Sequence, residues 1–196
     1  SMKHQSLFIR AVVILATGLF CTTQARAASK PNIILILTDD MGWDIAALGH
    51  PHVKTPHLDR LVGEGRVFEN YYVASPVCSP TRVSFMTGLH PSRFGIHDYI
   101  NADWRANWRR GMPNFLDPNV VTVADVVKRA GYRTGHIGKW HLRSDPVGFD
   151  HWDVLPGQGH YYAPDFRSAE GSRRIPGYVT DITTDLALAW LESDRD

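Results

Sequence analysis

Three stretches of the chain carry apolar patterns that are typical of strands. Residues 32–38 form a continuous apolar run of strand length, the pattern of a strand buried on both faces in a parallel sheet. Residues 66–73 hold several Val, Phe and Tyr side chains, and residues 132–137 form a shorter run. The sequence therefore predicts three strands, at residues 32–38, 66–73 and 132–137.

Helix-start signals and periodicity predict helices between and after these strands. Thr55 and Ser79 each precede a proline, which is the signature of a cap followed by the first helical residue. The helix that starts at Ser79 is expected to run to about Gly88. Thr122 caps another helix, with apolar residues at helical spacing, and Gly131 terminates it.

The remaining segments are one more helix and two loop regions. Residues 180–192 predict a last helix with an apolar stripe. Residues 89–119 lack periodicity and are predicted to be rich in loops. Residues 144–178 hold many Gly, Pro and aromatic residues and are predicted to be loops on the side where a ligand binds. Alternating strands and helices favour an α/β layered domain, in which ligands bind beyond the carboxyl ends of strands.

The N-terminus is predicted to be removed from the mature protein. Residues 1–27 read as a cloning remnant followed by a secretory signal peptide, with a basic start, an apolar run at 11–20 and a small-x-small cleavage site at 25–27. The apolar run is shorter than the roughly 20 residues that a membrane-spanning helix needs. We therefore expect a periplasmic or secreted protein, with Cys21 discarded, residues 28–196 as the mature domain, and no membrane association after cleavage.

Composition excludes some partners and singles out one cysteine. The chain has 196 residues, 43% hydrophobic and 21% charged, which suits one globular domain with a core. A formal net charge of +1 gives no electrostatic case for nucleic acid, and we expect none as a partner. Without the leader, Cys78 has no disulfide partner, so it is either an inert core thiol or a chemically special one.

Two polar clusters could carry chemistry. Asp39 and Asp40 follow the first predicted strand, where they either cap a turn or ligate a hard cation such as Ca²⁺ or Mg²⁺. Cys78 lies at a helix start, where free N–H groups favour an anion, and Arg82 lies one turn further on. Either Arg82 donates to the same anion, or Cys78 is a core residue and Arg82 is solvated.

Three motifs in order resemble those of one enzyme family. Cys78-x-Pro80-x-Arg82 resembles the signature of type I sulfatases, in which a maturation enzyme oxidises the cysteine to formylglycine. Residues 131–141 look like the second signature of that family, and residues 31–40 resemble its opening strand and metal ligands. The resemblance implies an alkaline-phosphatase-like three-layer α/β sandwich around a central, mostly parallel sheet, here incomplete at its C-terminus.

The resemblance also implies a metal site. Asp39 and Asp40 would bind the divalent cation, usually calcium in this family, although magnesium is possible, and the formylglycine at Cys78 would complete part of its shell. Complete sulfatases are longer and supply further ligands beyond the region matched here. The chain is therefore expected to be the N-terminal part of a catalytic domain, and its activity alone is an open question.

The implied reaction is hydrolysis of a sulfate monoester. One hydroxyl of the hydrated formylglycine attacks sulfur and displaces the alcohol, which leaves a covalent sulfate hemiacetal. Deprotonation of the other hydroxyl, with His141 as the base, then returns the aldehyde and expels sulfate. Arg82 would support the hydrate and the metal site, and Lys139 would contact the sulfate. His136, inside a predicted strand, is interpreted as structural.

Residues 149–166 indicate the class of substrate but not a single substrate. Residues 149–166 look like a segment of sulfatases that act on amino-sugar and other carbohydrate sulfates, so a sulfated glycan is expected, with aryl sulfates also accepted. Arg105, Arg109 and Arg110 either line a site for an anionic sugar or form a solvated face. The alternatives are a phosphate or phosphonate monoester hydrolase on the same fold, and an inactive glycan-binding fragment. The sequence does not indicate an oligomeric state.

Overall fold

The computed structural model describes residues 30–193, and the chain divides after Gly42 into two units. In the first unit, residues 32–38 form no strand, and their apolar side chains are exposed, Ile36 by 74%. The strand predicted there is therefore wrong. An extended run becomes a strand only when its backbone groups bond to a neighbouring strand, and apolar composition does not supply that neighbour.

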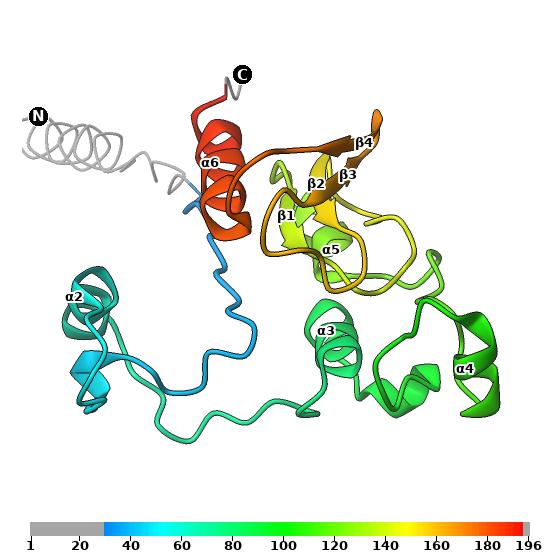
Figure 1. Ribbon diagram of the computed structural model, residues 1–196, viewed down its shortest axis with the longest axis horizontal. Helices are drawn as coiled ribbons and strands as arrows, with labels where there is room; N and C mark the ends of the chain where they lie inside the picture. Colours follow the sequence, from blue (N-terminus) through cyan, green and yellow to red (C-terminus); the bar gives the residue numbers. More distant parts are fainter. Residues whose placement is uncertain (1–29, 194–196) are drawn as a thin grey trace, which may run out of the picture. The chain divides into compact units, whose positions relative to one another are not determined.

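The second unit contains a four-stranded mixed sheet, shown in Figure 1. The strands β1 (Gly135–Lys139), β2 (His151–Leu155), β3 (Asp165–Ser168) and β4 (Gly171–Arg174) lie side by side in chain order. The strands β1 and β2 are parallel, with Lys139 opposite Leu155, while β2–β3 and β3–β4 are antiparallel. The α/β class is confirmed, but only one strand pair of this sheet is parallel. A two-residue turn joins β3 to β4, and so short a connection can only produce an antiparallel pair.

Apolar side chains pack on both faces of the sheet, because neighbouring residues of β2 point to opposite sides. Val154 belongs to the larger core cluster, which includes Val83 and Met86 of α3 (Cys78–Thr87). Leu155 belongs to a smaller cluster with Phe166 and Ile182, the latter from α6 (Val179–Glu192). The sheet therefore lies between two layers, one of which contains α3 and the other α6.

Several predicted helices are confirmed together with their boundaries. The helix α2 (Pro56–Glu64) begins at its proline, α3 ends at Gly88 in the left-handed conformation, and α6 lies where the last helix was predicted. The helix α5 (Val123–Arg129) starts with a full capping box, in which the Thr122 hydroxyl and the Asp125 carboxylate bind each other's backbone N–H. Among these helices only α5 has a side-chain cap; the predicted cap Thr55 makes no capping bond in α2, and α6 was located from its apolar stripe.

Other local predictions are corrected by the structure. Residues 66–73 form no strand, and the strand expected at 132–137 lies later, at β1. Residues 144–178 are not all loop, because they contain β2, β3 and β4. Residues 89–119 contain the short helices η2 (Pro91–Phe94) and α4 (Trp104–Arg109), and a further short helix, η1 (Ala46–Leu48), precedes α2.

Ser79 is not the cap of α3. The helix begins one residue earlier, at Cys78, with Val77 as the N-cap and no capping side chain. The buried hydroxyl of Ser79 bonds elsewhere, as described below.

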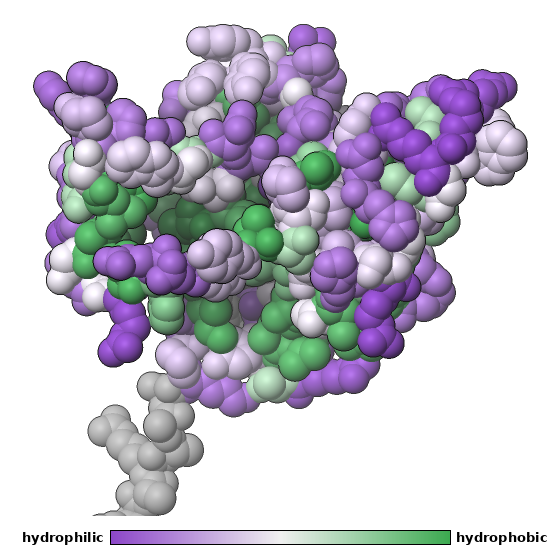
Figure 2. Space-filling model, turned by 90° about the horizontal axis from the view of Figure 1, so that it is seen from below, coloured by the Kyte–Doolittle hydropathy of each residue, from purple (hydrophilic) through white to green (hydrophobic). Residues whose placement is uncertain are grey.

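Apolar side chains also reach the surface at several places on the face that Figure 2 shows. Tyr72 is 85% exposed and Phe68 69%, both in the segment wrongly predicted as a strand. Among the described residues, no helix is long and apolar enough to cross a membrane. The predicted signal peptide lies outside the described residues.

Candidate active site

The start of α3 meets the segment that follows β1, and this contact joins two of the predicted catalytic residues. Cys78 is the first residue of α3, and its Sγ lies 3.1 Å from Nδ1 of His141. His141 comes two residues after β1 and has a left-handed backbone with φ of 52°, which is uncommon for a residue with a side chain. The structure therefore brings together two side chains that are 63 positions apart in the sequence.

Ser79 fastens these two segments to each other. Its hydroxyl donates to the carbonyl oxygen of His141 at 3.0 Å and accepts from the backbone N–H of Ile100 at 3.0 Å. Ser79 is fully buried, so these bonds are made without competing water. The hydroxyl thus fixes the backbone of His141 against α3.

Arg82 lies one turn into α3 and is directed at β1. One nitrogen of its guanidinium, NH1, donates to the carbonyl oxygen of Lys139, and the residue is only 7% exposed. A solvated position for Arg82, one of the two sequence interpretations, is therefore wrong. Support of a hydrated aldehyde by Arg82 stays a prediction, and holding the end of β1 is a contact that the sequence did not indicate.

Lys139 ends β1 and is linked to Cys78 through a residue that the sequence analysis did not single out. The Lys139 ammonium donates to Oε1 of Gln158, and Nε2 of Gln158 lies 3.9 Å from Sγ of Cys78. Gln158 comes three residues after β2, and the last residue of β2 is paired with Lys139. The rule that ligand sites form beyond the carboxyl ends of neighbouring parallel strands could have found it.

His136 lies in β1 but is not suited to proton transfer at neutral pH. Burial, and then the positive charge of Arg82, lower the pKa of His136 from 6.5 to about 4. Its ring packs 5.1 Å from that of Trp140 and 5.3 Å from that of Phe149, and its Nε2 is buried without a hydrogen-bond partner among the described residues. A neutral structural role for His136 agrees with this environment.

Asp39 and Asp40 belong to the first unit, and their relation to Cys78 stays a prediction. Both carboxylates are exposed, and Asp40 has φ of 59°, a backbone conformation that Asp tolerates better than most residues. Within residues 30–193, no group of three or more acidic, His or Cys side chains gathers into a metal site. Two adjacent exposed carboxylates provide oxygen donors of the kind that Ca²⁺ and Mg²⁺ bind.

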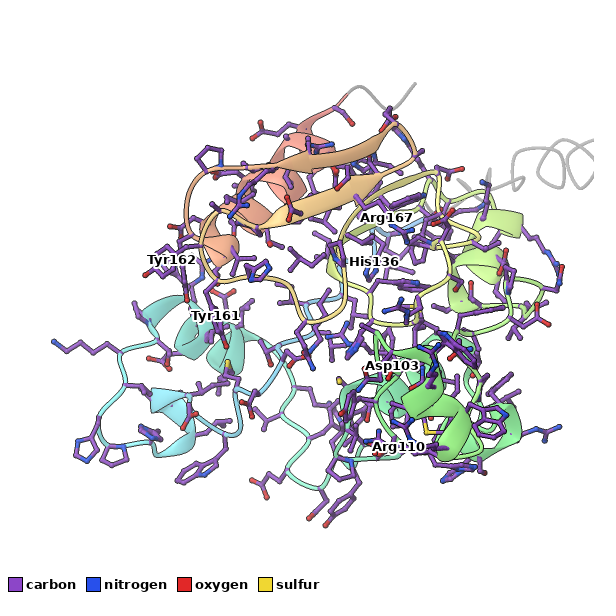
Figure 3. The ribbon with its side chains drawn as sticks, turned by 45° about the vertical axis from the view of Figure 1, so that its right-hand side comes forward. Asp103, Arg110, His136, Tyr161, Tyr162 and Arg167 are labelled. Atoms are coloured by element: carbon purple, nitrogen blue, oxygen red, sulfur yellow. The ribbon has the colours of Figure 1, made fainter. Side chains whose placement is uncertain are left out.

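The arginines near α4 have structural partners. Arg110 pairs with Asp98 at 3.1 Å and lies over the ring of Tyr99, and this contact with Arg110 lowers the pKa of Tyr99. Arg105 lies 5.0 Å from the ring centre of Trp104. Figure 3 shows Asp103, the side-chain cap of α4, and Arg110 close to this helix. Arg110 is therefore engaged with its neighbours.

A cavity adjoins His141, and two exposed tyrosines lie on the loop that follows β2. A cavity of about 170 Å³ is lined in part by His141, Arg143, Gly157 and Arg167. Tyr161 and Tyr162 lie on the loop before β3, as Figure 3 shows, and are 75% and 74% exposed. The cavity carries the cationic side chains of Arg143 and Arg167, which suit anionic groups, and the exposed tyrosines offer the kind of apolar face on which a sugar ring packs.

The sequence profile of the sulfatase family matches residues 31–196. The chain belongs to the sulfatase family. The matched range includes Asp39, Asp40, Cys78 and the segment from Lys139 to His141, so the motifs that suggested the family all lie within it.

Curated relatives of this sulfatase-family chain act on sulfated sugars according to their names. An N-acetylglucosamine-6-O-sulfatase of Bacteroides thetaiotaomicron is 35% identical over 97% of the chain and 33% of its own length. An N-acetylgalactosamine-6-sulfatase of Rattus norvegicus is 39% identical over 74% of the chain and 28% of its own length. The chain spans a third or less of these relatives.

Solved structures share the fold. One, described as a complex with its substrate D-glucosamine-2-N,6-O-disulfate, is 35% identical, with a TM-score of 0.67 over 78% of the chain and 28% of its own chain. Another, crystallised with k-i-k-neocarrahexaose, is 26% identical, with a TM-score of 0.72 over 83% of the chain and 41% of its own. These likenesses support the partial α/β domain described above.

Proposed function

We propose that this sulfatase-family chain hydrolyses sulfate monoesters of a carbohydrate, with residue 78 as the nucleophile after oxidation to formylglycine. The contact of 3.1 Å between Cys78 and His141 carries the proposal. It places the imidazole of His141, which can accept a proton, directly against the side chain of residue 78 at the start of α3. In the mature protein, the position of the sulfur atom would be taken by a hydroxyl of the aldehyde hydrate.

One hydroxyl of the hydrate attacks sulfur, the bond from sulfur to the sugar oxygen breaks, and the sugar alcohol leaves. The proton of the second hydroxyl must then be removed so that the hemiacetal collapses to the aldehyde and releases sulfate. His141 is positioned to take that proton, because Nδ1 faces the side chain of residue 78 and Ser79 fixes the His141 backbone. The Lys139 ammonium would bind the sulfuryl oxygens, since Gln158 joins it to the same side chain. The free N–H groups at the start of α3, which no side chain caps, favour the same anion.

A divalent cation would be held by Asp39 and Asp40 together with an oxygen of residue 78. When bound, such a cation would neutralise charge that develops on the sulfuryl oxygens. Calcium is the family expectation, with magnesium as the alternative. This assignment rests on the carboxylate oxygens, their exposure and the family motif.

The proposed substrate class is an amino sugar sulfated at the 6-position. Two of the relatives are named for 6-sulfated amino sugars, and one solved structure holds a glucosamine disulfate. The exposed tyrosines and the cavity beside His141 provide the kind of surface that a sugar ring needs. Export through the leader is part of this proposal, and a mature protein that begins at residue 28 would support it.

The decisive experiment combines a mass measurement with paired assays. Protein coexpressed with a formylglycine-generating enzyme should show residue 78 about 18 Da lighter than cysteine, and should cleave N-acetylglucosamine-6-sulfate. The matching Cys78→Ala variant should be inactive. Faster cleavage of a phosphate monoester than of the sulfate would favour the phosphate or phosphonate hydrolase. A matured protein that binds the sugar sulfate without turnover would favour the inactive glycan-binding fragment.

A further inference from the structure

The Gln158 side chain forms a bridge between two residues of the proposed site. Its Oε1 accepts from the Lys139 ammonium, and its Nε2 lies 3.9 Å from Sγ of Cys78. An amide is suited to this place because it offers an acceptor to the cation and a donor to the nucleophile at the same time. A carboxylate or an ammonium here could serve only one of the two.

The backbone around Gln158 presents the amide at this position. Gly157 and Gly159 flank it, both with positive φ, of 59° and 76°, and the N–H of Gly159 bonds to the carbonyl of Pro156 at 3.0 Å. This tight turn follows directly after β2, whose last residue pairs with Lys139. Gln158 thus extends from a turn that the sheet fixes in register with the end of β1.

Gln158 itself is exposed and contributes nothing to the core. A long polar side chain on a surface turn normally samples many rotamers, and holding it in one has an entropic cost. Two hydrogen bonds to groups of the site offset that cost, and neither is needed to pack the domain. The arrangement therefore indicates a role in the site and not in folding.

We propose that Gln158 is a positioning residue, which holds the Lys139 ammonium beside residue 78 and thereby sets the affinity of the site for the sulfuryl anion. This inference rests on the proposed function, because it takes Lys139 as the sulfate contact. A neutral amide at position 158 orients the Lys139 ammonium without itself adding a negative charge. The turn after β2 becomes a determinant of anion binding.

Three substitutions in matured protein test this. Gln158→Ala and Gln158→Met should each raise the dissociation constant of inorganic sulfate, measured by calorimetry, about tenfold, because one hydrogen bond to a charged group is lost. Gln158→Glu should raise it about a hundredfold, since its carboxylate would pair with Lys139 and repel sulfate. The kcat/KM for N-acetylglucosamine-6-sulfate should fall in the same order.

Controls separate positioning from packing. Met matches Gln in length but lacks the amide, so wild-type sulfate binding by Gln158→Met would overturn the proposal. Equal binding by Gln158→Glu and wild type, or no sulfate binding by the wild type, would also overturn it. His160→Ala changes an exposed residue of the same loop and should leave sulfate binding and stability unchanged. All variants should unfold at the wild-type urea midpoint.

The binding arm is independent of turnover. If the wild type binds sulfate but cleaves no sulfate ester, the proposed function fails, and the order of sulfate affinities among the Gln158 variants still decides the role of Gln158.

Discussion

Replacement of Ser79 by alanine should destabilise the domain and disturb the site together. The Ser79 hydroxyl is completely buried and bonds to the carbonyl of His141 and to the N–H of Ile100, both at 3.0 Å. Alanine would leave both backbone groups without this partner. A buried polar group that loses its partner costs about 1–3 kcal/mol, so we expect a loss of about 2–6 kcal/mol from the pair. That is a large part of the 5–15 kcal/mol by which typical domains are stable.

The same helix offers a matched control. Ser84 also has a buried hydroxyl, but this one has no hydrogen-bond partner among the described residues. Removal of an unsatisfied hydroxyl relieves a desolvation cost, so Ser84→Ala should be neutral or slightly stabilising. The two variants delete the same atom from the same helix and differ only in the bonds that the atom makes.

Urea unfolding followed by circular dichroism measures the difference. Ser79→Ala should lower the midpoint with an unchanged m-value, and Ser84→Ala should not lower it. In matured protein, Ser79→Ala should also lower kcat, because the His141 backbone loses its anchor. Equal midpoints for the two variants would refute the idea that the Ser79 hydroxyl fastens the segment after β1 to α3.

Three further predictions follow from the packing. Because the pKa of His136 is about 4 in the folded protein and 6.5 as its ordinary value, the unfolded chain binds the extra proton between these values. The free energy of unfolding should therefore fall by about 3 kcal/mol as pH is lowered from 6.5 to 4. Urea unfolding midpoints measured at several pH values should show this fall in full in a His97→Ala control. The fall should be smaller in His136→Phe. Gly135→Ala would place a Cβ 2.7 Å from the Trp190 ring, so a loss of about 1–3 kcal/mol is expected in thermal or urea unfolding, and wild-type stability would show that α6 can shift freely. Thr122→Ala removes the cap of α5 and should cost about 1 kcal/mol; an unchanged urea midpoint would contradict a role of the capping box in stability.

Helices were located from the sequence because their signals are local. The box formed by Thr122 and Asp125 and the left-handed Gly88 fix their helix ends through contacts within a few residues. The same reasoning failed at Ser79, where the hydroxyl bonds to His141, which is 62 positions away. A local cap signal cannot reveal a distant acceptor that competes for the same hydroxyl.

Strands were harder to predict because they depend on partners. The run at residues 32–38 is strongly apolar yet forms no strand, whereas β4 consists of four exposed residues with no apolar side chain. The strand β4 forms because a two-residue turn folds it back onto β3, and pairing with β3 supplies its hydrogen bonds. At residues 32–38, apolar composition indicated neither burial nor a paired strand, so strand pairing has to be established separately.

The motifs predicted residues of the candidate site, but they did not predict Gln158, which contacts two of those residues. Cys78 and His141 were identified through the family signatures, and the structure places them in contact. Gln158 belongs to neither signature, and its role follows from the register between β1 and β2. A positioning residue such as Gln158 is recognised only when the structure shows that the carboxyl ends of β1 and β2 lie side by side.

A capping side chain at the start of α3 should raise the stability of the domain and weaken its binding of sulfate. Asp103 and Thr122 cap α4 and α5 with side chains, but Val77 leaves the first N–H groups of α3 without such a cap. Its backbone, with φ of −112° and ψ of 141°, already has the conformation of a capping residue. Val77→Ser and Val77→Asp should therefore each raise stability by about 1 kcal/mol in urea unfolding.

Both substitutions should weaken sulfate binding, because the new side chain takes the Ser79 N–H, the one capping donor that this helix start offers, since Pro80 has no N–H. Asp should weaken it much more than Ser, since its negative charge lies beside the sulfuryl group. If calorimetry showed wild-type sulfate affinity in a stabilised Val77→Asp protein, the start of α3 would not face the anion, and its missing cap would have no connection with the reaction.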